Sequence, residues 1–138
     1  MRLATLSLLV LALAACGGHK AATPTQVARA WSAALNRDDN KAAAALFAKN
    51  AQVIQDSVLE LPTQDDAVRW NRLLPCGGTI VGVTVQRADT VLVTFQLKER
   101  PFHACDGPGQ EAAAIFRVEH GKIVVWHQVP PPPPRSTV

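Results

Sequence analysis

Several motifs that would assign this chain to a large functional class are missing from its sequence. It has no Gly-rich phosphate loop, no Gly-x-Ser-x-Gly elbow and no His-Glu-x-x-His pair, which removes the usual patterns of nucleotide-binding proteins, serine hydrolases and zinc proteases. Its 14 Lys and Arg residues are scattered and are not interleaved with aromatic residues. Because nucleic-acid-binding proteins carry clustered basic stripes, we expect no nucleic-acid partner.

The apolar run from Leu3 to Ala15 is too short to cross a bilayer, which takes roughly 20 residues. Arg2 precedes the run and small residues end it, a combination typical of a secretory signal. The stretch Leu13-Ala14-Ala15-Cys16-Gly17 resembles the lipobox of bacterial lipoproteins. This resemblance implies a signal peptide over residues 1–15 and acylation of Cys16. The alternative is an ordinary signal peptide followed by a chance cysteine.

A lipoprotein N-terminus implies both a partner and a location. Two or more acyl chains anchor a protein stably, so the predicted partner is a membrane, reached through the lipid on Cys16. The predicted location is the bacterial cell envelope, at the outer membrane or periplasmic face in a Gram-negative host, with a Gram-positive surface as the alternative. Residues 16–22 predict a short lipidated tether. Residues 130–138 predict a proline-rich tail that does not join a sheet.

Cysteine is scarce, and only Cys76 and Cys105 remain once Cys16 is acylated. Two cysteines in an oxidising compartment are usually bridged, so we predict a disulfide between Cys76 and Cys105. Free thiols and a metal site are the alternatives. A metal site needs more ligands at short spacing than two cysteines and the neighbouring His103 supply, so we expect no metal and no cofactor.

Periodicity divides residues 23–129 into helices followed mostly by strands. Apolar residues at helical spacing follow a capping box of Thr23 and Gln26, and a second cap at Thr63 opens a helix that Pro75 ends. Alternating apolar residues predict the later strands. The predicted helices are Pro24 to Leu35, Asn40 to Ala48 and Thr63 to Leu74, and the predicted strands are Gln52 to Gln55, Val58 to Leu61, Thr79 to Gln86, Thr90 to Lys98, Glu111 to His120 and Ile123 to Val129.

This order of elements resembles the nuclear transport factor 2-like superfamily, in particular its SnoaL-like branch. The resemblance lies in Val27 to Leu35, in Ala42 to Phe47 and in the ending Gly121 to Val129, and it covers residues 23–129. It implies an α+β fold in which three N-terminal helices pack against a curved, cone-shaped antiparallel sheet around a pocket. It also implies a homodimer through the sheet. Members include isomerases, cyclases, epoxide hydrolases and dehydratases, as well as proteins without known catalysis.

A set of aromatic residues and one glutamine is the ligand-binding set that the resemblance implies. Large aromatic residues occupy the helix and strand positions that line the family's pocket, although they are also expected in the core of a small domain. Strand alternation places Gln128 on the face of Trp126, and His127 opposite with Ile123 and Val125. The set is Trp31, Trp70, Phe95, Phe116, Trp126 and Gln128.

A catalytic base is hard to assign. SnoaL-like cyclases carry an acidic residue close to the position of Gln128, and a glutamine takes no proton at neutral pH. The candidates are His127, since histidine titrates near neutral pH, and Asp56, which also fits a turn. With no tyrosine in the chain, the tyrosine-based oxyanion hole of ketosteroid isomerases cannot form. His103 and Asp106 flank the predicted disulfide and are expected at the rim or the surface.

Three functions are compatible with these features. The first is a membrane-anchored lipoprotein whose domain binds a small apolar ligand, or acts as an accessory module, without catalysis. The second is a small isomerase, cyclase or hydratase of SnoaL type that uses His127 or Asp56 as general base. The third is an envelope protein-interaction module that works through the sheet face or the proline tail. We favour the first and keep enzymatic activity as the alternative.

Overall fold

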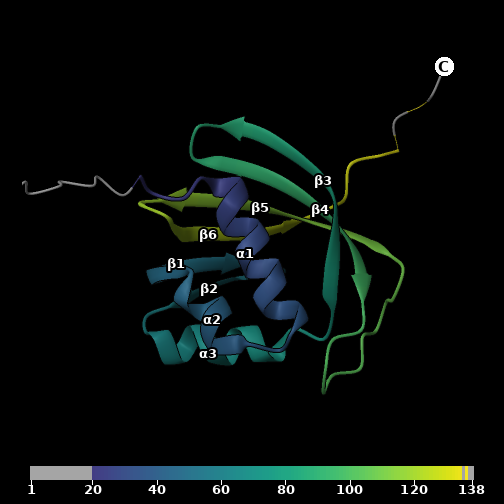
Figure 1. Ribbon diagram of the computed structural model, residues 1–138, viewed down its shortest axis with the longest axis horizontal. Helices are drawn as coiled ribbons and strands as arrows, with labels where there is room; N and C mark the ends of the chain where they lie inside the picture. Colours follow the sequence, from purple (N-terminus) through teal and green to yellow (C-terminus); the bar gives the residue numbers. More distant parts are fainter. Residues whose placement is uncertain (1–19, 135, 137–138) are drawn as a thin grey trace, which may run out of the picture.

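The computed structural model describes residues 20–134 and residue 136. The predicted signal peptide, Cys16 and most of the predicted tether lie outside the described residues. Within the described part of the chain, no helix is long and apolar enough to span a bilayer. The elements of that part, shown in Figure 1, are α1 (Pro24–Asn36), α2 (Asn40–Ala45), β1 (Phe47–Ile54), β2 (Val58–Leu61), α3 (Gln64–Leu73), β3 (Gly77–Arg87), β4 (Thr90–Lys98), β5 (Glu111–Glu119) and β6 (Lys122–Val129).

The two long helices start where the sequence predicts, at side chains that cap free backbone N–H groups. The Thr23 hydroxyl accepts a hydrogen bond from the Gln26 backbone, and the Gln26 side chain accepts one from the Thr23 backbone. Thr63 and Asp66 form the same reciprocal box at the start of α3. Because each box uses residues three positions apart, the helix starts are set by local sequence.

The boundary between α2 and β1 differs from the predicted helix to Ala48 and strand from Gln52. The helix ends at Ala45, and β1 already begins at Phe47. The cause is tertiary, because Phe47 pairs with Ile123 of β6, whose backbone N–H donates to the Leu46 carbonyl at 2.8 Å. Hydrogen bonds to a distant strand override the helical preference of the alanine-rich segment.

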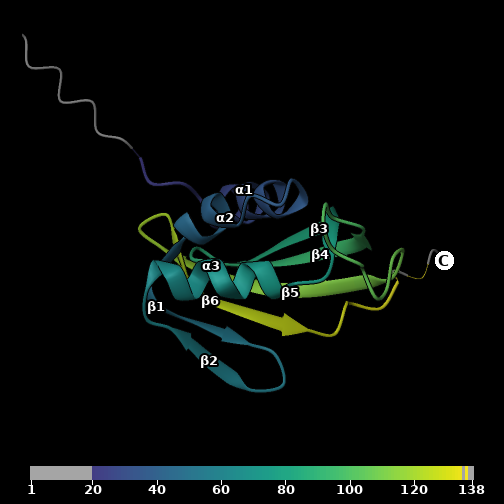
Figure 2. The same cartoon turned by 90° about the horizontal axis from the view of Figure 1, so that it is seen from below.

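The strands of the described chain form one sheet in the order β2-β1-β6-β5-β4-β3. Neighbouring strands are antiparallel except β1 and β6, which run parallel. The sheet bends around the helices (Figures 1 and 2), with α1 against β3 to β6 and α3 beside β1 and β2. The predicted α+β class, with three helices against a curved sheet, is confirmed. The parallel pair is a departure from the expected all-antiparallel sheet.

A bulge in β6 changes which of its residues share a face. The register with β5 shifts within the strand, and Val124 is left without a pairing partner on β5. As a result Ile123 and Trp126 both enter the core, with 0% and 6% of their surface exposed. The expectation that Ile123 lies on the face of His127 is therefore wrong, because strict alternation fails across a bulge.

The predicted disulfide between Cys76 and Cys105 is present, with an S–S distance of 2.06 Å. It joins the residue just before β3 to the loop that connects β4 and β5. Within that loop, the Cys105 backbone N–H donates to a Glu99 carboxylate oxygen at 3.0 Å. The disulfide therefore ties the β4–β5 loop to the connection between α3 and β3, and the Glu99 contact braces the loop internally.

Candidate functional site

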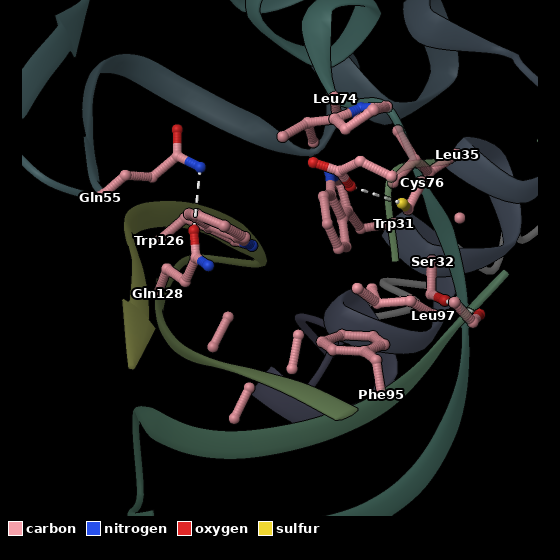
Figure 3. A pocket seen from close by; sticks show the side chains of 17 residues that line it. Trp31, Ser32, Leu35, Gln55, Leu74, Cys76, Phe95, Leu97, Trp126 and Gln128 are labelled. Carbon is pink, nitrogen blue, oxygen red and sulfur yellow. Dashed lines mark hydrogen bonds between the residues drawn. The ribbon is translucent and has the colours of Figure 1, made fainter. Parts of the chain in front are cut away.

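A cavity of about 330 Å³ lies between α1, the α3–β3 connection and the inner face of the sheet (Figure 3). We call it the main cavity. Its polar lining side chains are Ser32, Gln55, Asp106 and Gln128. The other lining residues are apolar, aromatic or glycine, namely Trp31, Leu35, Leu74, Pro75, Cys76, Gly77, Gly78, Phe95, Leu97, Ala112, Ala113, Ala114 and Trp126.

The main cavity exists because β5 carries small side chains on its inner face. Ala112 pairs with Phe95 of β4, and Ala114 pairs with Gln128 of β6. Their methyl groups occupy little of a space that larger residues would fill in a close-packed interior. Gly78 brings β3 close to the same wall, since a Cβ at this position would lie 3.0 Å from the Phe95 Cβ.

Aromatic rings form the large apolar walls of the main cavity. The Trp31 ring lies edge-to-face with Phe95, at 6.1 Å between centroids, and 5.9 Å from Trp126. Its Nε1 donates to Oδ1 of the buried Asn71 at 2.8 Å, which fixes the ring. By contrast, the buried Nε1 of Trp126 has no hydrogen-bond partner among the described residues, and the ring packs edge-to-face on Trp70 at 4.9 Å.

Two glutamine side chains meet at one end of the main cavity. Gln55 Nε2 donates to Gln128 Oε1 at 2.9 Å (Figure 3). Because Gln55 follows β1 and Gln128 lies near the end of β6, this contact links the β1–β2 hairpin to the last strand. Amides donate and accept hydrogen bonds but take no proton at neutral pH. This end of the cavity can therefore orient a ligand without acting as a base.

A single carboxylate, Asp106, is found among the described residues that line the main cavity. Its side chain is solvent-exposed, and its Oδ1 lies 3.5 Å from the Cys76 sulfur. This is a contact without a hydrogen bond, because the sulfur belongs to the disulfide and carries no proton. The two sulfurs and Asp106 are close enough to hold a metal ion. Sulfurs bonded to each other do not act as thiolate ligands, however.

No family model matches the sequence, and no curated protein matches it. Solved structures do match. A nuclear transport factor 2-like protein of unknown function from Cytophaga hutchinsonii matches with a TM-score of 0.65 at 14% identity, over 84% of this chain and 96% of its own. A candidate polyketide cyclase from Sinorhizobium meliloti matches with a TM-score of 0.60 at 18% identity, over 75% of this chain and 93% of its own. A third match is a protein of ketosteroid isomerase-like fold from Catenulispora acidiphila, solved in complex with trimethylamine. Its TM-score is 0.58 at 16% identity, over 78% of this chain and 86% of its own.

The chain has the nuclear transport factor 2-like fold. The predicted resemblance is confirmed at this level, because similarity at such low identity establishes a fold and leaves the function to be argued from individual residues. The main cavity is the hollow that this fold encloses between helices and sheet. Its chemistry depends on which side chains line it.

The nuclear transport factor 2-like fold distributes the predicted ligand-binding residues over three environments. Trp70 lines a second cavity of about 310 Å³, together with Leu59 of β2 and Leu73 of α3. Phe116 is fully buried in the core and lines neither cavity. The members that line the main cavity are Trp31, Phe95, Trp126 and Gln128.

Neither candidate base lines either cavity. Asp56 is exposed in the turn between β1 and β2. His127 follows Trp126 in β6 and pairs with Ile54 and Ile115 of the neighbouring strands, so its side chain lies on the opposite face of the sheet from Trp126. A general base must lie within hydrogen-bond reach of the proton it takes, and the geometry therefore favours neither residue.

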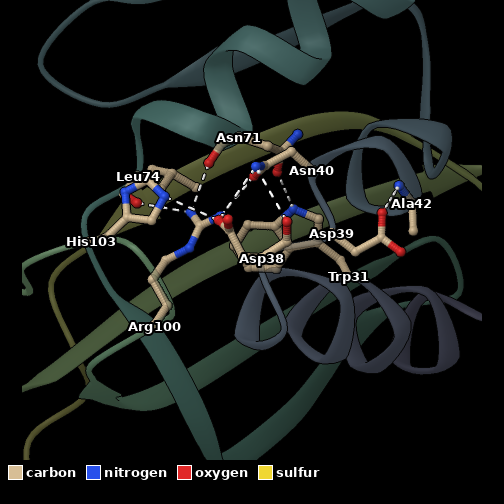
Figure 4. A network of polar contacts seen from close by, with 9 residues as sticks. All are labelled: Trp31, Asp38, Asp39, Asn40, Ala42, Asn71, Leu74, Arg100 and His103. Carbon is tan, nitrogen blue, oxygen red and sulfur yellow. Dashed lines mark hydrogen bonds and ion pairs between the residues drawn. The ribbon is translucent and has the colours of Figure 1, made fainter.

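A buried polar cluster near the end of α3 is a feature that sequence reasoning missed (Figure 4). At its centre is Arg100, whose side chain is 0% exposed. Arg100 Nη1 donates to the backbone carbonyls of Asn71 and Leu74, at 2.9 and 2.8 Å. Arg100 Nη2 donates to side-chain oxygens of Asp38 and Asn40, at 2.6 and 2.7 Å. We call Arg100 and these four partners the polar clamp.

Asp38 balances the charge of the polar clamp. Its Oδ1 accepts from Arg100 and also lies 3.0 Å from His103 Nε2. Desolvation raises the pKa of Asp38, but the hydrogen bond and charge of Arg100, with the contacts of His103 and Asn40, hold this pKa below its ordinary value of 3.8. Asp38 is therefore ionised at neutral pH and neutralises the buried guanidinium.

The polar clamp supports two walls of the main cavity. Leu74 lines the cavity while its carbonyl accepts from Arg100. Asn71 holds the Trp31 indole through its side chain and Arg100 through its carbonyl. No pattern in the sequence marks Arg100, because an arginine next to a proline in a loop is normally exposed. Its role follows from the fold, which brings the β4–β5 loop, the α1–α2 loop and the end of α3 together.

Proposed function

We propose that this domain binds a small, largely apolar molecule in the main cavity and does not catalyse a reaction. The observation that carries the proposal is the cavity itself, a partly open hollow of about 330 Å³ lined by aromatic and alanine side chains with amide groups at one end. Ligand sites in proteins are commonly about 300–1,000 Å³, with apolar walls and a few polar groups. A protein of similar fold was solved in complex with a small molecule, trimethylamine, which supports small-molecule binding as a function that this fold can have.

The lining favours binding over acid–base catalysis. Such catalysis needs an ionisable group within reach of the reacting atom and a second polar group that orients it. Asp106 is the ionisable side chain of the lining, and among the described residues no donor hydrogen-bonds to it. An isomerase, cyclase or hydratase is the second candidate function. It rests on Asp106, since His127 and Asp56 lie outside the cavity.

The binding proposal is tested by purifying the protein under non-denaturing conditions and identifying retained molecules by native mass spectrometry. We expect a small molecule at one copy per chain. Filling the cavity with Ala112→Phe should remove it, while Ala88→Phe in the exposed β3–β4 turn should leave it bound. If wild type retains nothing and no library compound shifts its melting temperature, the binding function is refuted.

We also propose that the protein is anchored to the cell envelope through lipid on Cys16, on the strength of the lipobox-like stretch Leu13 to Gly17. Mass spectrometry of the N-terminal peptide should show an acylated Cys16 as the first residue. Cys16→Ser should shift the protein from the membrane fraction to the soluble fraction. An unmodified thiol on the processed chain would contradict the anchor and leave the binding domain unaffected.

Association through the sheet, or through the proline tail of residues 130–138, stays a prediction of the sequence. Sedimentation of the purified protein tests the homodimer. A monomer at tens of micromolar concentration would contradict it.

A further inference from the structure

The main cavity differs in charge from the rest of the molecule. The chain carries a formal net charge of +3. Among the described residues that line the cavity, however, there is no Lys, Arg or His, and the one charged side chain is the carboxylate of Asp106. A ligand in this cavity therefore meets a negative group and no positive one.

The nearby buried guanidinium does not reverse this sign. Arg100 is 0% exposed and spends its four recorded hydrogen bonds on the polar clamp. Asp38 neutralises its charge at a distance of 2.6 Å. His103 also faces Asp38, at 3.0 Å, and does not line the cavity. Asp106 has no ion-pair partner among the described residues, so its charge is available to a ligand.

The aromatic walls act in the same direction as Asp106. Trp31, Phe95 and Trp126 present π systems, whose faces carry partial negative charge and attract cations. Tryptophan is the strongest of the aromatic side chains in this respect. The mutual hydrogen bond of Gln55 and Gln128 leaves the Gln55 oxygen and the Gln128 amino group for a ligand, so this end offers one acceptor and one donor and no net charge. An anion would instead lie beside Asp106 with no counter-charge, which disfavours acidic ligands.

We propose that the molecule held in the main cavity is an organic cation, an alkylammonium compound with an apolar body. Its ammonium group interacts with Asp106 and the tryptophan rings, and its apolar part packs against the alanines of β5. This inference rests on the proposed binding function and adds the charge of the ligand to it. Asp106 is accordingly the residue that sets specificity.

The test compares three probes of similar shape and different charge on the full chain. Benzyltrimethylammonium is the cation, 2,2-dimethylpropylbenzene is its uncharged carbon isostere, and benzylsulfonate is the anion. The fluorescence of Trp31, Trp70 and Trp126, which are all the tryptophans of the chain, reports binding because all three belong to the aromatic cluster around the cavities. Calorimetry gives the dissociation constants independently.

We expect the cation to bind about tenfold more tightly than its isostere and the anion to bind most weakly. Asp106→Asn should weaken the cation about threefold and leave the isostere unchanged. Asp65→Asn, which removes an exposed carboxylate that does not line the cavity, is the matched control and should change neither. Both variants should unfold at the same urea concentration as wild type.

Equal affinities for cation and isostere, or tighter binding of the anion, would overturn the cation inference and leave the binding function in place. An unchanged cation preference in Asp106→Asn would overturn the role of Asp106. If none of the three probes binds, while the protein unfolds cooperatively, the cation inference fails. The binding function is then decided separately, by the retained-molecule and library tests described above.

Discussion

The main cavity and the polar clamp meet at Leu74, which lines the cavity and whose carbonyl accepts from Arg100, yet they are built on different principles. The walls of the cavity come from residues at regular positions of helices and strands, such as Trp31 and Phe95, and hydrophobic burial holds them. The clamp comes from loops and helix ends far apart in the chain and is held by hydrogen bonds to Arg100. The comparison shows that the apolar walls of the cavity depend on the hydrogen bonds of the neighbouring polar clamp for their position.

The largest loss of stability should follow from removing the Arg100 charge at the centre of the polar clamp. Arg100→Met leaves two backbone carbonyls and the Asp38 carboxylate without their donor. We expect the free energy of unfolding to fall by roughly 3–5 kcal/mol, the usual effect of breaking a buried charged pair. Urea unfolding followed by tryptophan fluorescence measures it.

Arg72→Met is the control for the Arg100 variant, because Arg72 is exposed near the end of α3, the helix that carries Asn71 of the clamp. A surface change of this kind should stay within about 0.5 kcal/mol. If the two variants lose the same stability, the clamp is not the support that its geometry indicates.

The next largest effect comes from the disulfide, which ties the cavity wall at Cys76 to the clamp's loop at Cys105. Replacing both cysteines by serine should cost about 3.5 kcal/mol, by the chain-entropy relation for a bridge with a sequence separation of 29. Thermal unfolding with and without reductant measures it. Reductant should lower the melting temperature of wild type and leave the double variant unchanged; a wild type insensitive to reductant would contradict the prediction.

A smaller difference in stability is expected between Trp31→Phe and Trp126→Phe, although the two substitutions remove the same atoms. Trp31→Phe leaves Oδ1 of the fully buried Asn71 without its donor, whereas Trp126→Phe removes an N–H that has no partner among the described residues. The Trp31 variant should therefore be less stable than the Trp126 variant by about 1–2 kcal/mol. Equal stability in urea titrations would show that the Trp31–Asn71 bond contributes nothing.

The smallest effect is the acid sensitivity of the clamp. The pKa of Asp38 is lower in the folded state than its ordinary value of 3.8, so the folded state binds this proton more weakly than the unfolded state. The contribution of Asp38 is thus complete above pH 3.8 and is lost as the pH falls through the folded-state pKa. Stability of wild type should decline more steeply below pH 4 than that of Asp38→Asn.

Asparagine suits the Asp38 test because it tolerates the left-handed backbone found there, with a φ of 58°. Asp65→Asn provides the control, since Asp65 is exposed and makes no recorded hydrogen bond. Parallel pH profiles of wild type and Asp38→Asn would rule out a role for the Asp38 charge. Chemical unfolding at pH steps between 2 and 5 gives these profiles.

Sequence reasoning succeeded where the deciding contacts are local. The capping boxes at Thr23 and Thr63 and the strand Thr90 to Lys98 are confirmed. The disulfide has a sequence separation of 29 and is also confirmed, because the cysteine count predicts it without any knowledge of the fold. It failed where a contact between distant segments decides. The early start of β1 needs β6 as its partner, and the burial of Arg100 needs the α1–α2 loop and the end of α3 in place.

The same division applies to the candidate site. Trp31, Phe95, Trp126 and Gln128 line the main cavity, as their positions on helix and strand predict. Ser32 and Gln55 were missed, because small polar residues at a helix surface or strand end carry no signal of their own. Asp106 was expected at the rim or the surface and is exposed, but it lines the main cavity because the disulfide holds the neighbouring Cys105 against Cys76.

The parallel pairing of β1 with β6 has a consequence for the order in which the molecule is made. Synthesis delivers the β1–β2 hairpin early, yet the neighbour that joins it to the sheet is the last strand of the domain. A ribosome-bound chain therefore cannot close its sheet until Val129 has emerged, and such long-range pairing forms slowly. Late closure of this kind would suit the export that the signal-like N-terminus predicts, because an unclosed sheet leaves the chain able to pass through a translocation pore.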